Sequence, residues 1–416
     1  MKLSAPELAG TSCEARNEAL RAIAAALETA RDGIFAVNAE DLAAAEAAGV
    51  AEAVKKRLKF DEAKLADCVA GIGQLVGLPD PLGKVTLHRE LDEGLVMQRV
   101  TVPIGVIGVI FEARPDALVQ IASLCLKSGN CAILKGGSET AKTNRALFSV
   151  IHRAATEAGL PENCLHLAET HSEIDELLAC DKEVDLLIPR GSNAFVRYIM
   201  EHTKIPVLGH ADRICHNNVD ASADPEQAIR VILDAKTQDA AASNAVETVL
   251  VDRRIAAAFV PDLAKALKEA GVRIHGTDEV ASLIDCEPVG ETGFSTEYLE
   301  LALTIALVDG AAAASAHINR YGSHHTDAIL ATDEAAIRYF RQTVDSAGVY
   351  VNCSTRFADG FRYGFGAEVG ISTSKIHARG PVGLEGLETY KYLITGGGHI
   401  VGDYASGEKS FRFRDL

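Results

Sequence analysis

Hydrophobic residues in the first part of the chain recur every three or four positions. Residues 14–30 are rich in Ala, Leu, Arg and Glu at this spacing, and residues 38–48 and 61–76 repeat the pattern. Such a period places the apolar side chains on one face of a helix. Asp61 is a suitable N-cap for the third helix, and the prolines within residues 79–83 end the series. We therefore predict a helical region that extends to about residue 77.

Between residues 85 and 102 apolar and polar residues alternate on both sides of the sequence Asp92-Glu93-Gly94. Alternation is typical of a strand with one exposed face, and a short turn that contains glycine joins two such strands easily. This stretch is therefore predicted to be a β-hairpin.

Another pattern begins at residue 104, where short apolar runs alternate with helical stretches. Residues 104–111 are almost continuously apolar, which is typical of a strand buried on both faces. Further runs predict strands at residues 131–135, 164–168, 184–189, 248–251, 303–308 and 348–351. The intervening stretches predict helices at residues 117–128, 139–158, 172–179, 225–236, 255–270 and 333–344. Strands and helices in alternation form parallel βαβ units, so the predicted fold class is α/β.

Composition and charge mainly exclude functions. A chain of 416 residues, 48% of them hydrophobic and 24% charged, suggests a globular protein of more than one domain. The net charge of −17 disfavours a nucleic acid or an anionic membrane as a partner. The cysteines are odd in number and lack a Cys-x-x-Cys pair, so we expect reduced thiols and no metal site. Because neither a signal pattern nor a bilayer-spanning apolar run is present, we expect a cytoplasmic location.

Two glycine-containing segments could bind a phosphate group. Lys135 ends a predicted strand and precedes Gly136-Gly137-Ser138, which combines a fixed cation with open backbone amides. Gly191 and Ser192 precede a predicted helix at residues 193–202, whose N-terminus favours an anion. A lysine whose ammonium group simply reaches solvent and a plain N-cap serine would explain the same residues.

The order of several motifs resembles the γ-glutamyl phosphate reductases, a branch of the aldehyde dehydrogenase superfamily. The motifs are Glu112-Ala-Arg-Pro-Asp116, residues 133–139, Lys236-Thr-Gln, Asn244-Ala-Val-Glu-Thr248, Ser295-Thr-Glu-Tyr-Leu299, and residues 354–360, 364–373 and 377–385. The similarity extends from about residue 10 to residue 402. It implies an aldehyde-dehydrogenase-like fold with a Rossmann-type cofactor-binding domain (1–84 and 103–230), an α/β catalytic domain (231–393) and an oligomerisation arm (85–102 and 394–416).

The resemblance also implies an activity. In this family, L-glutamyl 5-phosphate is reduced with NADPH to L-glutamate 5-semialdehyde and phosphate, in proline biosynthesis. The expected partners are this small-molecule substrate, further copies of the chain and, as a candidate, glutamate 5-kinase. The stretch Leu208-Gly-His210 replaces the glutamate that activates water in hydrolytic aldehyde dehydrogenases, which favours an acyl-phosphate reductase.

Site residues follow from the same resemblance. The positions implied for cofactor binding are Lys135, Gly137, Ser138, Gly191, Ser192 and Glu297, the last of which matches the glutamate that binds the nicotinamide ribose. Arg114, Arg356 and Arg379 are the candidates for binding the substrate, since a guanidinium group pairs with carboxylate and phosphate. Structural salt bridges are the alternative for the arginines, and a solvated glutamate is the alternative for Glu297.

The nucleophile position departs from the family. Where the family has a catalytic cysteine before Asn244, this chain has Ser243. A serine hydroxyl without an activating base is barely ionised at pH 7, so the covalent step is expected to be crippled. Backbone amides near Ser243, together with the Asn244 side chain, are the candidate oxyanion donors. Cys215 and Cys353 are the candidates for a substitute nucleophile.

Other substitutions lie close to the nucleophile in the sequence. Arg213, Asn217, Asn218 and Asp239 also differ from the family pattern. A catalytically inactive pseudoenzyme, a knockout variant or a redesigned scaffold on the same oligomeric fold is therefore the alternative to an active reductase.

Overall fold

The computed structural model describes residues 1–112, 114–169, 172–209, 214–290 and 293–416. The chain forms two compact units. The first unit contains Met1–Leu208, Phe365–Gly370 and Val382–Leu416. The second unit contains Gly209–Gly364 and Ile371–Pro381. Within the described parts of the chain, no helix is both long enough and apolar enough to cross a membrane.

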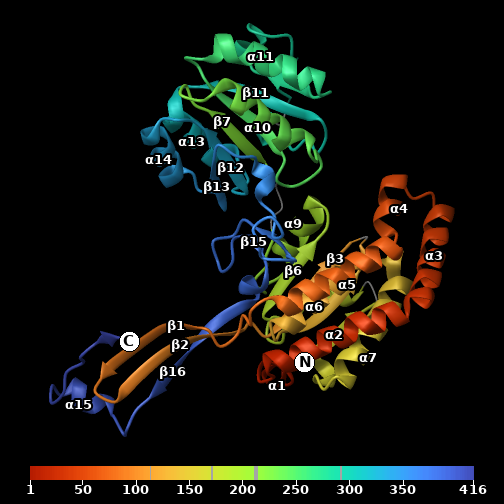
Figure 1. Ribbon diagram of the computed structural model, residues 1–416, viewed down its shortest axis with the longest axis vertical. Coiled ribbons are helices and arrows are strands. Elements are labelled where there is room, and N and C mark those ends of the chain that lie inside the picture. Colours follow the sequence, from red (N-terminus) through yellow and green to blue (C-terminus); the bar gives the residue numbers. More distant parts are fainter. Residues whose placement is uncertain (113, 170–171, 210–213, 291–292) are drawn as a thin grey trace. The chain divides into compact units, whose positions relative to one another are not determined.

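The first unit begins with the predicted helical region (Figure 1). Its helices are α1 (Ala5–Ala9), α2 (Cys13–Thr29), α3 (Arg31–Ala47), α4 (Glu52–Leu58) and α5 (Glu62–Gly77). Asp61 caps α5 as predicted, because its carboxylate accepts a hydrogen bond from the Lys64 amide at 3.1 Å. The hydrophobic pattern did not predict α1 and α4, which have five and seven residues.

A four-stranded parallel sheet follows, in the order β5-β4-β3-β6. Its strands are β3 (Val106–Phe111), β4 (Cys131–Gly136), β5 (Leu165–Ala168) and β6 (Leu186–Arg190). Its helices are α6 (Pro115–Lys127), α7 (Ala141–Glu157), α8 (Ser172–Ala179) and α9 (Asn193–His202), with 3-10 turns at Ser138–Thr140 and Glu162–Cys164. All of β3 is buried, as its continuous apolar run predicts. Gly105 precedes it with φ 132°, and a side chain there would collide with the Asp185 carboxylate.

A separate antiparallel sheet, in the order β16-β2-β1-β17, forms an arm within the first unit. Its elements are β1 (Val85–Asp92), β2 (Leu95–Pro103), β16 (Glu388–Thr395), α15 (Val401–Ala405) and β17 (Arg414–Asp415). The predicted hairpin is confirmed. The arm begins earlier in the C-terminal part than residue 394, because β16 pairs with β2 from Glu388 to Thr395.

The second unit contains a parallel sheet in the order β10-β9-β11-β8-β7-β12-β13. Its strands are β7 (Cys215–Val219), β8 (Val246–Asp252), β9 (Arg273–Gly276), β10 (Glu287–Pro288), β11 (Ala302–Val308), β12 (Thr326–Leu330) and β13 (Gly348–Val351). Its helices are α10 (Pro225–Thr237), α11 (Ala256–Glu269), α12 (Asp278–Ala281), α13 (Gly310–Tyr321) and α14 (Glu334–Thr343), with 3-10 turns at Gly293–Ser295 and Thr355–Phe357. The ribbon β14 (Gly370–Ser372) and β15 (Gly380–Val382) precedes a last 3-10 turn at Leu384–Leu387. Because β7 pairs with β8 and β12, this sheet starts before the predicted domain boundary at residue 231.

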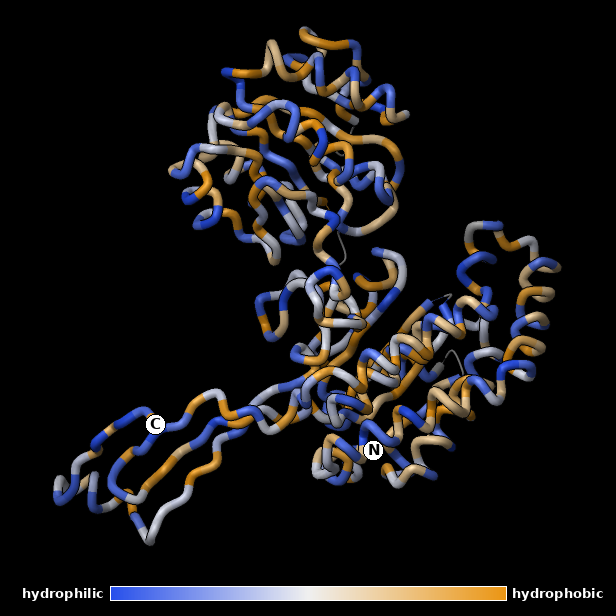
Figure 2. The backbone as a smooth tube through the Cα atoms, viewed as in Figure 1, coloured by the Kyte–Doolittle hydropathy of each residue, from blue (hydrophilic) through white to orange (hydrophobic). Residues whose placement is uncertain are grey.

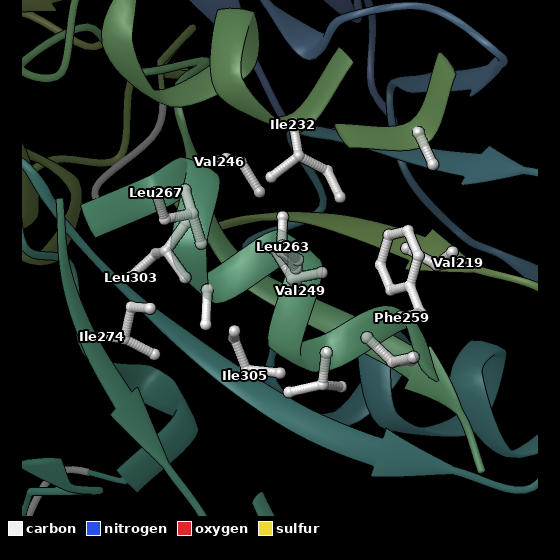
Figure 3. Close-up of a cluster of buried hydrophobic side chains, with 14 of the residues drawn as sticks. Val219, Ile232, Val246, Val249, Phe259, Leu263, Leu267, Ile274, Leu303 and Ile305 are labelled. Carbon is white, nitrogen blue, oxygen red and sulfur yellow. The ribbon is translucent and has the colours of Figure 1, made fainter. Parts of the chain in front are cut away.

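Helices cover both faces of the seven-stranded sheet. Helices α10 and α11 bury one face, and Figure 3 shows Ile232, Phe259 and Leu263 directed at strand residues of this core. Helices α13 and α14 pack on residues of the opposite face, where Ile318 and Phe340 lie in one hydrophobic cluster. Along the helices the tube of Figure 2 alternates between orange and blue, as expected of helices with one buried side.

Candidate active site

The segment between α10 and β8, residues 238–245, contains the nucleophile position 243 and is termed the nucleophile loop. It forms two successive turns. The Ala242 amide donates to the Asp239 carbonyl at 3.3 Å, and the Ala245 amide donates to the Ala242 carbonyl at 3.0 Å. Ser243 lies half-buried in the second turn. No hydrogen bond joins its hydroxyl to another of the described residues, and the Ser243 carbonyl accepts a bond from the Cys215 thiol at 3.6 Å. The structure therefore provides no base that would activate Ser243 among the described residues.

Neither cysteine near this loop is suited to replace the nucleophile. Cys215 lies in β7 and is fully buried behind the loop. Burial, aided by the Asp327 charge, raises the pKa of its thiol well above the usual value. Burial also raises the pKa of Cys353. Both groups remain protonated at neutral pH, so these two candidates are not supported.

Asn244 and Arg356 hold the loop together. The Asn244 Nδ2 atom donates to the Ala358 carbonyl at 2.8 Å, and its Oδ1 atom accepts a bond from Arg356. The Nε atom of Arg356 donates to Gln238 Oε1 at 2.8 Å, and its Nη2 atom lies 3.9 Å from an oxygen of Asp239. These contacts bear on two predicted roles, which stay predictions: Asn244 as an oxyanion donor and Arg356 as a substrate-binding residue. The Asn244 amide and the Arg356 guanidinium both bond within the protein, and this geometry fits positioning of the loop.

The other predicted substrate-binding arginines lie elsewhere. Arg379 belongs to the second unit, where its Nη2 atom contacts the Asp345 carboxylate at 3.2 Å. This ion pair and Lys375, which contributes most, lower the pKa of Asp345. The buried Nε atom of Arg379 has no hydrogen-bond partner among the described residues, which leaves one donor for a ligand. Arg114 belongs to the first unit and is exposed at the start of α6.

A buried ion pair lies at the base of the loop. Its two residues belong to the family motifs Lys236-Thr-Gln and Asn244-Ala-Val-Glu-Thr248, but the motifs alone indicate no function for them. Lys236 in the last turn of α10 and Glu247 in β8 are 3.0 Å apart and at most 1% exposed. Burial raises the pKa of Glu247 to about 7, although Lys236 favours the charged form. Burial disfavours the charged form of Lys236 as well, and therefore lowers the pKa of its ammonium group. A lysine on the apolar stripe of α10, and a glutamate within an apolar strand, are the signals that could have identified the pair.

The predicted phosphate-binding residues of the first unit meet at one edge of its sheet. Phe111, Gly136 and Arg190 are register partners at the carboxyl ends of β3, β4 and β6. Residues that follow these strands, among them Gly137 and Gly191, therefore lie along the same edge, which is where open α/β sheets bind ligands.

One turn at this edge already binds an anionic group. The Ser192 amide, at the N-cap of α9, donates to a Glu112 carboxylate oxygen at 3.0 Å. A side chain at Gly191 would meet the same carboxylate, so glycine leaves room for Glu112 to lie against the turn. The turn therefore has the donor and the space that a phosphate oxygen needs.

The edge contains a second polar group. Lys135 is buried, and its ammonium group donates to the carbonyl of Gly136 at 2.9 Å. A side chain at Gly137 would collide with the Glu139 carboxylate, and Ser138 begins a 3-10 turn. The backbone at Gly137 can thus approach a ligand closely, provided that Glu139 moves aside.

Two of the unusual residues bury amides inside the second unit. Asn217 and Asn218 lie in β7 and are at most 1% exposed. Neither side chain has a hydrogen-bond partner among the described residues. Asp239 accepts a bond from the Ala241 amide at 3.2 Å and so shapes the nucleophile loop. His210 and Arg213 lie outside the described residues.

Comparison with known proteins agrees with this architecture. Residues 2–287 match the aldehyde dehydrogenase family. With its Rossmann-type and seven-stranded sheets, the chain therefore belongs to this family, and the predicted fold class is confirmed.

Similarity to individual proteins narrows the class. The chain is 56% identical over 402 residues to gamma-glutamyl phosphate reductase 1 of Synechocystis sp., a match that covers 96% of this chain and 93% of the relative. The crystal structure of gamma-glutamyl phosphate reductase from Thermotoga maritima has 36% identity and a TM-score of 0.94, with 96% of this chain and 97% of that chain covered. Within the aldehyde dehydrogenases, this chain belongs to the γ-glutamyl phosphate reductases, as its motifs predicted.

Proposed function

We propose that the site is built for the NADPH-dependent reduction of L-glutamyl 5-phosphate to L-glutamate 5-semialdehyde and phosphate, a reaction of proline biosynthesis. The observation that carries the proposal is the 56% identity, over 96% of the chain, to a relative named as a γ-glutamyl phosphate reductase. The ordered loop around position 243, with its positioning residues intact, supports it.

The first unit supplies the residues that would hold the cofactor. Gly191 and Ser192 form the turn for a pyrophosphate oxygen after β6, and Lys135 with Gly137 and Ser138 lies at the end of β4, on the other side of β3. The fit is supported by the carboxylate that the Ser192 amide already binds. In the second unit, Glu297 would bind the nicotinamide ribose. When bound, NADPH supplies the hydride for the reduction.

The side chain at position 243 would attack the acyl phosphate and release phosphate, with a backbone amide of its turn as donor to the oxyanion. Ser243 is a poor nucleophile in this setting, because no described residue acts on its hydroxyl as a base. A second candidate function follows from this feature and from the two unpartnered amides of β7. The chain would then be a pseudoenzyme that retains ligand binding and assembly without turnover.

The arm supports a proposal of homo-oligomerisation. Strand β16 lies at the edge of its sheet and exposes large apolar side chains, including Tyr390, Tyr392 and Ile394. An exposed apolar edge strand is a surface that proteins usually cover. We propose that a further copy of the chain covers it, and the mass of the particle in solution, by light scattering, tests this.

The test of the activity is phosphate-dependent NADP⁺ reduction with glutamate 5-semialdehyde, the reverse reaction. The chain, its Ser243→Cys variant and a Ser243→Ala control are compared. We expect the cysteine variant to exceed the unsubstituted chain by on the order of a thousandfold, since loss of a nucleophile costs at least this much. Silence of all three proteins would favour the pseudoenzyme. Equal activity of the serine and alanine forms would show that the Ser243 hydroxyl contributes nothing.

A further inference from the structure

Glu247 connects the nucleophile loop to the segment that contains Glu297. One carboxylate oxygen of Glu247 accepts a bond from the Lys236 ammonium group at 3.0 Å and from the Tyr298 amide at 3.3 Å. The other oxygen accepts a bond from the Leu299 amide at 3.4 Å. The carboxylate thus contacts the end of α10 and two consecutive amides that directly follow Glu297.

The segment around Glu297 depends on such contacts. Residues 296–299 have no regular secondary structure, and Leu299 has φ 54°, which is unfavourable for a residue with a side chain. The contacts of the Tyr298 ring fix its side chain only: its hydroxyl and the Thr304 hydroxyl share a 2.7 Å hydrogen bond, and the ring stacks on His275. Glu247, by contrast, binds the backbone itself, at the amides of Tyr298 and Leu299.

We propose that Glu247 is a positioning residue, which orients Glu297 for the nicotinamide ribose by binding the amides of Tyr298 and Leu299. This inference rests on the proposed function. Lys236 holds the carboxylate in place from the end of α10. Since Lys236 lies in the last turn of α10, just before the nucleophile loop, one buried ion pair sets the geometry of both the loop and the Glu297 segment.

The experiment is a fluorescence titration of NADPH binding to the full chain, which requires no turnover. Glu247→Gln replaces one of the two acceptor oxygens by an NH2 group. This NH2 group would face either the Lys236 ammonium group or a backbone amide, which are both donors. We expect its dissociation constant to rise about tenfold, the size of one lost charge-assisted hydrogen bond. Asp252→Asn is the matched control, because Asp252 is also a buried, ion-paired carboxylate of β8. Its dissociation constant should not change.

A double-mutant cycle with Glu297→Gln separates positioning from general damage. If Glu247 acts through Glu297, adding Glu247→Gln to Glu297→Gln weakens binding no further. Should Glu247→Gln fail to fold, the paired change Lys236→Met with Glu247→Leu preserves burial but leaves the two amides without their acceptor. This pair should also weaken binding about tenfold.

The outcomes distinguish the inference from the proposed function. Full affinity in Glu247→Gln, or an additive effect with Glu297→Gln, overturns the positioning role while the reductase assignment stands. Absence of NADPH binding to the unsubstituted chain overturns the assignment itself, and the positioning role with it. A tenfold loss that vanishes in the Glu297→Gln background supports the proposal.

Discussion

Replacing Asn218 by leucine should stabilise the second unit. Asn218 is 1% exposed in β7, between its register partners Leu250 and Ile329, and its amide has no hydrogen-bond partner among the described residues. An unpaired buried amide costs about 1–3 kcal/mol in protein mutational data. Leucine has nearly the same shape, so it removes this cost without creating a cavity. We expect the free energy of unfolding to rise by about 2 kcal/mol, and the melting temperature by about 4–8 °C.

The control is the same substitution at a partnered amide. Asn244 is 4% exposed, but its amide bonds to the Ala358 carbonyl and to Arg356. Asn244→Leu leaves both partners unsatisfied and should cost about 2 kcal/mol. Urea-induced unfolding, followed by circular dichroism with the m-value held constant, measures both changes. If Asn218→Leu destabilises the chain as much as Asn244→Leu does, the Asn218 amide is bonded and the reasoning is refuted.

Three further substitutions test other parts of the structure. Burial lowers the pKa of His317 from 6.5 to about 4, so between these pH values the unfolded chain binds this proton and the folded chain does not. Between pH 6.5 and 4 the free energy of unfolding should therefore fall by up to about 3 kcal/mol more in the unsubstituted chain than in His317→Phe. Chemical denaturation measures both, and parallel pH curves for the two proteins would contradict this. Arg356→Met should lower the free energy of unfolding by about 2 kcal/mol, since the Asn244 oxygen loses its donor. An unchanged urea midpoint would mean that the loop does not need the guanidinium group. Glu112→Gln removes the charge that competes at the Ser192 amide and should tighten NADPH binding about threefold, and weaker binding would show that Glu112 assists the cofactor.

Local patterns predicted the elements whose stability is local. The hairpin of β1 and β2 was predictable because alternation and the turn at Gly94, with φ 74°, lie within one short stretch. Strand β16 was not, since its side chains are mostly exposed and its pairing with β2 joins residues far apart in the sequence. Likewise, β7 belongs to the seven-stranded sheet because it pairs with β8 and β12, and these pairings join residues that are distant in the sequence.

For the site, the sequence predicted residue types better than their partners. The motifs identified Asn244 and Arg356, but a guanidinium group suits a ligand and a backbone loop equally well. In the structure Arg356 bonds to Gln238 and Asn244, which are 118 and 112 positions from it in the chain, so sequence patterns could not reveal these partners. The Lys236–Glu247 pair has the shorter separation of 11 positions, yet a helix end and a strand must fold before it forms.

The bonds that shape the nucleophile loop do not involve the side chain of Ser243. They come from the backbone of Asp239, Ala242 and Ala245 and from the side chains of Asp239, Asn244 and Arg356. A cysteine at position 243 should therefore leave the loop unchanged, because sulfur replaces an oxygen that bonds to no described residue. For the same reason, loss of the nucleophile does not by itself remove the binding geometry. A chain that binds NADPH tightly but turns over only as Ser243→Cys would have lost its chemistry at a single atom.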